Sequence, residues 1–220
     1  MNDFFDRHYE QYDAWYERNR FAYLSELEAV KKALPPEGYG LEVGVGSGRF
    51  AAPLGIAVGI DPSAKMIELA RARGVDARPG TGEELPFDDA VFDYVAIIVT
   101  ICFVRDPEKV IAESARVLKP DGKIIIGIID KESFLGRVYQ EKGSIFYGHA
   151  RFFSIKEIAG MLGTAGFGDL SYYQTIFDHP DNLDAVEKPV EGFGKGGFVV
   201  ISAASRKTAA AGPDPSWKAF

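Results

Sequence analysis

Three glycines, Gly44, Gly46 and Gly48, stand at alternate positions behind the apolar residues of the stretch GLEVGVGSGRF, residues 40–50. Glycine has no side chain to pack, so filling a core does not explain this spacing. Glycine does allow a sharp turn and a close approach of the backbone to a ligand. The chemistry expected of such a loop is therefore the binding of a phosphate, a dinucleotide or another cofactor against bare backbone.

Two familiar ligands of glycine-rich loops are disfavoured by the residues that follow the glycines. A phosphate-binding loop needs a Lys-Ser/Thr pair at this place, and the chain has Arg49 and Phe50 instead, so we discard that interpretation. A dinucleotide-binding loop needs a further glycine at the position of Arg49, where it lets the helix pack close to the sheet. Arg49 weakens the dinucleotide interpretation, which the glycines alone leave open, together with a tight turn that serves no ligand.

A carboxylate follows the glycines along the chain. Asp61 ends the predicted strand 57–60 and comes after Gly44 at close to the ~20 residues that separate a glycine loop from a ribose-binding acid in sheets of this kind. A carboxylate there can accept hydrogen bonds from both ribose hydroxyls. Asp61 also stands where it could cap the helix that begins near Pro62 and Ser63. The two roles are compatible, and we expect both.

Alternating apolar and amphipathic runs predict the elements that must position these residues. The predicted strands cover residues 41–45, 57–60, 75–79, 92–99, 123–129, 171–177 and 197–203, and the predicted helices cover residues 63–74, 106–118 and 154–167. Ser154 and Glu157 fit a capping box at the start of the last helix, and 178–196 is predicted to be a polar loop. Because strands alternate with helices, we expect an α/β fold with a doubly wound, mostly parallel seven-stranded sheet and a ligand at the carboxyl ends of its strands.

The same patterns divide the chain into parts. Residues 1–37 carry apolar residues at helical spacing, which predicts an N-terminal helical arm or lid. The length of 220 residues and the hydrophobic content of 46% suit one sizeable domain, which we assign to 38–205. Regular patterning lapses at about 130–150, where we expect a lid insertion, and 206–220 is expected to be a disordered tail.

Composition limits the classes of partner. The formal net charge of -7 argues against a large phosphate-neutralising surface, so we expect no nucleic acid partner. A single cysteine, Cys102, excludes an intramolecular disulfide and a multi-thiolate metal site, and no metal is expected. The chain has neither a hydrophobic signal-peptide core nor an apolar run long enough to span a bilayer, so we expect a soluble, cytoplasmic protein without a membrane partner.

Several stretches resemble one enzyme family. The pattern E-x-G-x-G-x-G at the end of the first predicted strand resembles motif I of the class I S-adenosylmethionine-dependent methyltransferases. AVGIDPSAKMIELAR, GTGEELPFDDAVFDYVAIIVT and RVLKPDG are similar to later stretches of the same family. The resemblance covers residues 38–130, extends more loosely to about 204, and is to the type called methyltransferase type 11. It implies a Rossmann-like class I methyltransferase fold, with S-adenosylmethionine as cofactor and S-adenosylhomocysteine as product.

The resemblance also implies roles for single residues. Cofactor contacts are expected from Glu42, Gly44, Gly46, Gly48, Asp61, Met66, Thr81, Gly82, Glu83 and Thr100. Thr81 stands where many relatives carry an acidic residue that accepts from the adenine amino group. A hydroxyl can accept that bond too, although without the assistance of a charge.

A small-molecule acceptor is expected to meet the cofactor above the sheet, under the arm and the insertion. The candidates for its pocket are Tyr12, Tyr16, Cys102, Phe103, Tyr147 and Arg151. His149 and Tyr16 are the candidates for a general base, which an oxygen acceptor would need and an aligned free amine would not. The sequence leaves open whether nitrogen or oxygen is methylated, and it leaves the oligomeric state open.

Two other functions fit parts of this pattern. An NAD-dependent oxidoreductase uses the same architecture, although Arg49 and the turn Leu85-Pro86-Phe87 speak against it. A non-catalytic, regulatory protein that binds S-adenosylmethionine would keep the same motifs. The favoured hypothesis is methyl transfer to a small molecule by in-line displacement.

Overall fold

Eight strands form one mixed sheet in the computed structural model, which describes residues 2–142 and 146–207. The strands are β1 Gly40–Val43, β2 Val58–Asp61, β3 Asp76–Pro79, β4 Phe92–Ile98, β5 Leu118–Ile129, β6 Phe167–Thr175, β7 Val190–Glu191 and β8 Phe198–Ser205. The helices are α1 Asn2–Arg18, α2 Arg20–Ala33, α3 Ala51–Leu54, α4 Ala64–Ala72, α5 Pro107–Val117, α6 Phe134–Lys142 and α7 Ile155–Thr164, with the 3-10 turns η1 Tyr147–His149 and η2 Pro180–Asn182.

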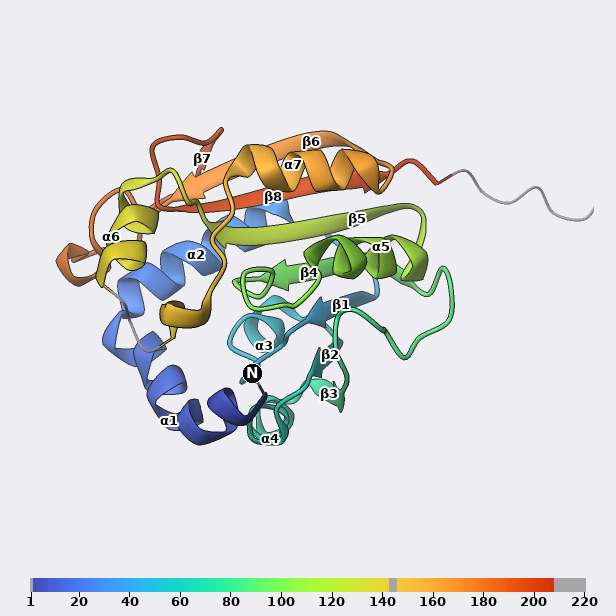
Figure 1. The fold of residues 1–220 in the computed structure, drawn as a ribbon, viewed down its shortest axis with the longest axis horizontal. Coiled ribbons are helices and arrows are strands. Elements are labelled where there is room, and N and C mark those ends of the chain that lie inside the picture. Colours follow the sequence, from blue (N-terminus) through green and yellow to red (C-terminus); the bar gives the residue numbers. More distant parts are fainter. Residues whose placement is uncertain (1, 143–145, 208–220) are drawn as a thin grey trace, which may run out of the picture.

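The strand order is β3-β2-β1-β4-β5-β8-β6-β7 (Figure 1). The first five strands in this order run parallel, whereas β8 pairs antiparallel with both β5 and β6. The predicted α/β fold with a doubly wound, mostly parallel sheet is confirmed. The predicted count of seven strands is wrong by one. The additional strand, β7, lies inside the predicted loop 178–196 and pairs with Tyr173 and Gln174 of β6. Two exposed residues at a sheet edge carry no alternating pattern that a sequence could reveal.

Apolar residues on both faces of the central strands explain why helices pack on both faces of the sheet. Along β4, Val95 and Ile97 belong to one hydrophobic cluster and Ala96 and Ile98 to the other, because successive side chains of a strand point to opposite faces. The first cluster is completed by α5 and α7, and the second by α2, α3 and α4. Figure 1 shows α5 and α7 in front of the sheet and α2 behind it.

Capping residues place the starts of the helices as predicted. The Ser63 hydroxyl accepts from the amide of Met66 at the start of α4. Ser154 and Glu157 form both hydrogen bonds of the capping box at the start of α7. These caps matter for the site, because α4 begins directly after the carboxyl end of β2.

The N-terminal arm contains α1 and α2, which pack differently. The α1 helix lies against α4, whereas α2 packs on β5, β6 and β8. In the predicted insertion 130–150 the structure describes α6 and η1, and most of the predicted tail 206–220 lies outside the described residues. Across the described part of the chain, no helix combines the length and the apolar character that crossing a membrane requires.

Candidate functional site

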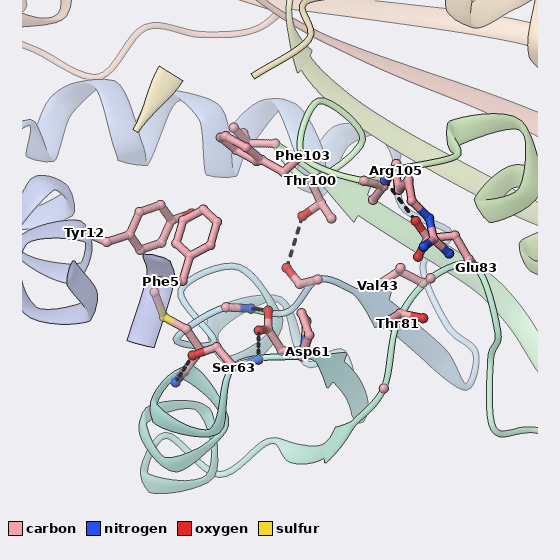
Figure 2. Close-up of a pocket in the computed structure, with 18 residues that line it drawn as sticks. Phe5, Tyr12, Val43, Asp61, Ser63, Thr81, Glu83, Thr100, Phe103 and Arg105 are labelled. Carbon is pink, nitrogen blue, oxygen red and sulfur yellow. Dashed lines mark hydrogen bonds between the residues drawn. The ribbon is translucent and has the colours of Figure 1, made fainter. Parts of the chain in front are cut away.

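A cavity of about 570 Å³ opens where β1, β2, β3 and β4 end (Figure 2). Its volume falls within the ~300–1,000 Å³ typical of small-molecule sites. It is lined by Phe5, Tyr12, Val43, Gly44, Gly46, Asp61, Pro62, Ser63, Met66, Gly80, Thr81, Gly82, Glu83, Val99, Thr100, Phe103, Val104 and Arg105. The cavity thus lies at the edge of the sheet where the alternation of strands and helices predicts a ligand.

The three alternate glycines serve two different purposes in the loop after β1. Gly44, Gly46 and Gly48 have φ angles of 71°, 51° and 80°, which residues with side chains rarely adopt. A Cβ atom on Gly44 would lie 2.2 Å from Cγ2 of Thr100, and one on Gly48 would lie 3.0 Å from Cα of Ala70. A Cβ atom on Gly46 would meet only a ring carbon of α1, 3.8 Å away. Gly44 and Gly48 therefore allow close packing, and Gly46 leaves bare backbone at the cavity.

The carboxylate of Asp61 braces this loop from the end of β2. Its two oxygens accept hydrogen bonds from the amides of Ser63 at 2.8 Å and Gly46 at 2.9 Å, as Figure 2 shows. Burial raises the pKa of Asp61 to about 6, although the two amides act to lower it. Since Asp61 also lines the cavity, its carboxylate is available both to the loop and to a ligand.

The loop after β3 approaches the cavity with little side-chain bulk. A Cβ atom on Gly82 would lie 2.8 Å from Cγ1 of Val43, so the backbone there packs directly against β1. The Glu83 carboxylate accepts a hydrogen bond from the amide of Arg105 at 2.9 Å, which ties this loop to the segment before α5. Thr81 is exposed and lines the cavity. What Thr81 and Gly82 present to a ligand is therefore mainly backbone and one hydroxyl.

The turn after β4 borders the cavity opposite Asp61. The Thr100 hydroxyl lies 3.1 Å from the carbonyl oxygen of Gly44 and 3.0 Å from that of Ile98, so its proton is already engaged. Val99, the residue before it, has a φ of 50°. A branched residue in this conformation stores strain, and such strain is common at functional sites.

Aromatic rings from α1 and from the β4 turn face this polar half of the cavity. The ring centroids of Phe5 and Phe103 are 5.4 Å apart, and those of Phe5 and Tyr12 are 5.7 Å apart. Tyr16 does not line the cavity; it lies behind Tyr12 and donates a 2.9 Å hydrogen bond to the Tyr12 hydroxyl. The cavity therefore has one polar side, made of backbone and Asp61, and one apolar aromatic side.

Besides Tyr16, four of the residues predicted for the acceptor site lie outside the cavity lining. Cys102 and Tyr147 border a separate small apolar pocket behind the β4 turn. Arg151 is exposed, with its guanidinium 4.8 Å from the ring centroid of Phe153. His149 is exposed on η1, where its ring lies 5.8 Å from that of a phenylalanine in α1. The structure does not bring these four side chains to the cavity.

The phenol and thiol groups near the cavity are neutral over the physiological pH range. Burial raises the pKa of Tyr12 and Tyr147 far above the ordinary value and that of Cys102 to about 12. Among the described residues, no group of three or more His, Cys, Asp and Glu side chains could hold a metal ion. The aromatic side of the cavity therefore provides an apolar surface that excludes water, and it provides no ionised base.

Glu42 lies beneath the glycine loop. It is 1% exposed, and its Oε2 has no hydrogen-bond partner among the described residues. Burial raises the pKa of Glu42 well above its usual range. A small polar space beside this side chain is bordered also by Tyr12, Tyr16 and Gly46. A donor placed in that space would satisfy the unpaired oxygen.

A charged cluster fastens α1 to the glycine loop. Asp13 of α1 accepts hydrogen bonds from the Ser47 hydroxyl at 2.6 Å, from Nε of Arg49 at 2.9 Å and from Arg73 at 2.8 Å. Burial acts to raise the pKa of Asp13, but these hydrogen bonds lower it to about 2. Arg49, whose side chain disfavours a dinucleotide-binding loop, thus helps to hold the arm in place together with Ser47 and Arg73.

Substituting Asp13 by alanine is expected to lower the free energy of unfolding by about 1–3 kcal/mol, because Arg49 and Arg73 both lose a partially buried partner. Faster amide hydrogen exchange should be confined to α1, and urea unfolding measures the loss of stability. Glu17→Ala is the control, since Glu17 is 68% exposed and its single ion pair with Arg49 is worth only about 0–1 kcal/mol. Equal effects of the two substitutions would contradict this account of the cluster.

Several lining residues carry no signal in the sequence. Phe5 belongs to a helical arm with many aromatics, and Val104 and Arg105 lie in a turn without a motif. The family resemblance named Thr81, Gly82 and Glu83 for this side of the cavity, but neither Val104 nor Arg105. The cavity-lining role of Phe5 follows from the docking of α1, which no local pattern encodes.

A family model described as "Methyltransferase domain" matches residues 41–126. The matched segment runs from β1 into β5 and so includes the glycine loop, Asp61 and the β4 turn. It contains most of the polar side of the cavity, whereas α1 lies outside it.

Two longer similarities cover nearly the whole chain, and a third covers less than half of it. A crystal structure of an S-adenosylmethionine-dependent methyltransferase of Thermotoga maritima, described as a possible histamine N-methyltransferase, superposes with a TM-score of 0.90 and is 49% identical, over 93% of this chain and 99% of that one. An uncharacterised protein of Methanocaldococcus jannaschii is 49% identical over 90% of this chain and 97% of its own length. The ubiquinone/menaquinone biosynthesis C-methyltransferase of Citrifermentans bemidjiense is 41% identical over 44% of this chain and 48% of its own length.

Proposed function

This chain belongs to the S-adenosylmethionine-dependent methyltransferases, and on that premise we propose that it methylates a small molecule that enters the cavity beneath α1. One observation carries the proposal. The cavity is polar where it meets the glycine loop and Asp61, and it is aromatic where Phe5, Tyr12 and Phe103 close it. The polar side suits a cofactor and the aromatic side suits a small, partly apolar acceptor.

The residues of the polar side fit S-adenosylmethionine. Asp61 supplies a carboxylate that would accept from ribose hydroxyls, and the bare backbone at Gly46 allows close approach. The backbone at Gly82, which lines the cavity, would lie along the edge of the adenine ring. The unpaired Oε2 of Glu42 lacks a donor, which the amino group of the methionine portion would provide. Polar groups that the fold leaves unsatisfied are therefore matched by groups of the cofactor.

Alignment and exclusion of water are the tasks that fall to this chain. When bound, the cofactor supplies a methyl group that its sulfonium already activates for displacement. Thr100 and the strained Val99 hold the β4 turn against the glycine loop, while Phe5 and Phe103 keep water from the acceptor. Orientation of two reactants can contribute roughly 7–11 kcal/mol in favourable cases. No ionised base is needed if the acceptor presents a free lone pair.

The arm and the insertion act, in this proposal, as covers of the domain 38–205. The α1 helix contributes Phe5 and Tyr12 to the cavity wall and is fastened through Asp13. A macromolecular acceptor would have to reach the cofactor past this wall. The net charge of -7 also disfavours nucleic acid. The names of two relatives, a possible histamine N-methyltransferase and a ubiquinone/menaquinone biosynthesis C-methyltransferase, likewise support a small acceptor.

The test is the release of S-adenosylhomocysteine from S-adenosylmethionine in the presence of amines, phenols, carboxylates, thiols and quinols. Turnover with at least one of these classes supports the proposal. Turnover confined to nucleic acid or protein acceptors would refute it. Binding of S-adenosylmethionine with no turnover in any class would favour the non-catalytic alternative, and tight binding of NAD in its place would favour the oxidoreductase.

A further inference from the structure

The α1 helix is interrupted near its start. His8 has a φ of -118° and a ψ of 16°, which lie outside the helical range. The helix therefore consists of a short first segment, residues 2–7, which we call the flap, and a longer second segment, residues 9–18. A change of backbone angles at a single residue of this kind is enough to reorient a whole segment. The interruption at His8 thus provides a hinge between the two parts of α1.

The second segment of α1 is held by several contacts. Asp13 accepts hydrogen bonds from the side chains of Ser47, Arg49 and Arg73, which join it to the glycine loop and to the end of α4. Tyr16, one turn further along, is only 6% exposed. This part of α1 is therefore anchored to the domain, whatever position the flap takes.

The flap is attached through Asp6. Its Oδ1 accepts a hydrogen bond of 2.6 Å from the Ser63 hydroxyl and one of 3.2 Å from the amide of Lys65. Both donors belong to the start of α4, where the helix dipole favours a carboxylate. Asp6 is only partly buried, so water competes for these contacts. The attachment can therefore break and form again without disturbing the core.

The flap also reaches over the cavity. Phe5 belongs to the flap and lines the cavity. Its ring centroid lies 5.4 Å from that of Phe103, in the turn after β4, and 5.7 Å from that of Tyr12, in the second segment of α1. Figure 2 shows the rings of Phe5 and Tyr12 next to each other. The flap thus extends across the cavity from the start of α4 to the turn after β4.

The partner of Asp6 belongs to the polar side of the cavity. Ser63 lines the cavity, and its amide donates a 2.8 Å hydrogen bond to the carboxylate of Asp61. Asp6 itself is not a lining residue. The flap is therefore fastened at a residue directly beside the carboxylate assigned to the ribose.

We propose that the flap gates the cofactor side of the cavity, turning at His8 and held shut by the contact of Asp6 with Ser63. Breaking this contact lets the cofactor enter and the product leave. Asp6 is then a positioning residue, because it acts through Ser63 and touches no reacting group. The gate goes beyond the proposed function, since it does not depend on which acceptor is methylated.

A gate predicts a specific change in the kinetics of binding. The flap closes in the same way over an occupied and an unoccupied cavity if Asp6 bonds only to protein groups, as it does here. Removing a contact that is equally strong in both states raises the rate constants of association and dissociation by the same factor. The dissociation constant stays the same, because affinity depends only on differences between the two states. A residue that only supports the fold would not accelerate association.

The experiment uses the whole protein at pH 7.5, where Asp61 is ionised. Stopped-flow fluorescence gives both rate constants for S-adenosylhomocysteine, and calorimetry gives the dissociation constant. Asp6→Ala should raise both rate constants about 10-fold and change the dissociation constant by less than about 3-fold. Asp6→Asn keeps an oxygen that accepts from Ser63, so both of its rate constants should stay within about 3-fold of wild type.

Glu10→Ala is the matched control. Glu10 is an exposed acid of the same helix beyond His8, and its carboxylate accepts a hydrogen bond from the Tyr9 hydroxyl. Its removal should leave both rate constants unchanged. An acceleration as large as that of Asp6→Ala would show a general loosening of α1 and would overturn the gate.

Two other results would also overturn it. Faster dissociation of Asp6→Ala without faster association would show that Asp6 strengthens binding rather than closing a gate. Unchanged rate constants together with a lower melting temperature would show a purely structural role for Asp6. Thermal unfolding of the same samples measures that temperature. We expect Asp6→Ala to melt close to wild type, because the contact lies at the surface and outside the anchored segment of α1.

Discussion

Replacing Asp61 by alanine is expected to weaken the binding of S-adenosylhomocysteine at least about 100-fold. Asp61 lines the cavity at the end of β2, and its carboxylate also holds the amide of Gly46. Two charge-assisted hydrogen bonds to ribose hydroxyls would together contribute about 3 kcal/mol or more. The substitution also removes the brace of the glycine loop, so the loss should exceed that of either contact alone.

Calorimetry at pH 7.5 measures this effect. Asp61→Asn retains one acceptor oxygen and should lose only about 10-fold in affinity. Asp88→Ala, at an exposed position away from the cavity lining, should bind like wild type. Undiminished uptake by Asp61→Ala would end the assignment of this carboxylate to the ribose.

The raised pKa of Asp61 makes the same binding sensitive to pH. The carboxyl is ionised above its pKa of about 6 and takes up a proton below it. Affinity should therefore fall roughly 10-fold per pH unit below about 6, rather than below the ordinary value near 4. The folding stability of the ligand-free protein should depend on pH in the opposite direction to the affinity. Because folding raises the pKa of Asp61, the stability linked to its protonated form is present at low pH and is lost as the pH rises through 6. Asp61→Asn should show neither dependence.

Substituting Gly44 by alanine is expected to reduce the free energy of unfolding by about 2–5 kcal/mol. Two causes add up. The φ of 71° is unfavourable for a residue with a side chain, and the new Cβ would stand 2.2 Å from Cγ2 of Thr100. Because Thr100 borders the cavity, its displacement should also abolish measurable binding of S-adenosylhomocysteine.

Two further variants separate these causes. Gly55→Ala has a similar φ of 69° but no atom within 4 Å of the new Cβ, so it should lose only about 1–2 kcal/mol. Combining Gly44→Ala with Thr100→Gly removes the clash and should recover part of the stability, which a double-mutant cycle in urea quantifies. Equal losses for Gly44→Ala and Gly55→Ala would show that the contact with Thr100 is unimportant.

Motif residues could be recognised without a structure because each lies next to a strong local signal. Gly46, Asp61 and Thr100 each directly follow a predicted strand, Gly44 lies near the end of one, and all four line the cavity. The carboxyl ends of neighbouring parallel strands meet at one edge of a sheet. Strand assignment therefore sufficed to bring these residues together.

Residues of the arm and the insertion were harder to place. Tyr12 and Phe103 line the cavity together with Phe5, which was not among the predicted residues, whereas His149 and Arg151 are exposed. The position of α1 depends on the contacts of Asp13 with residues of the glycine loop and of α4. Such long-range pairings leave no periodic pattern in the chain.

By itself the sequence determined the parallel core, the helix starts and the polar edge of the cavity, because hydrophobic period, capping residues and glycines act over a few neighbouring positions. The tertiary structure alone decided that β7 joins the sheet edge, that α1 covers the cavity and that Glu26 of α2 is buried. These features arise where segments far apart in the chain meet. Their free energy depends on burial and on partners that no local window of residues contains.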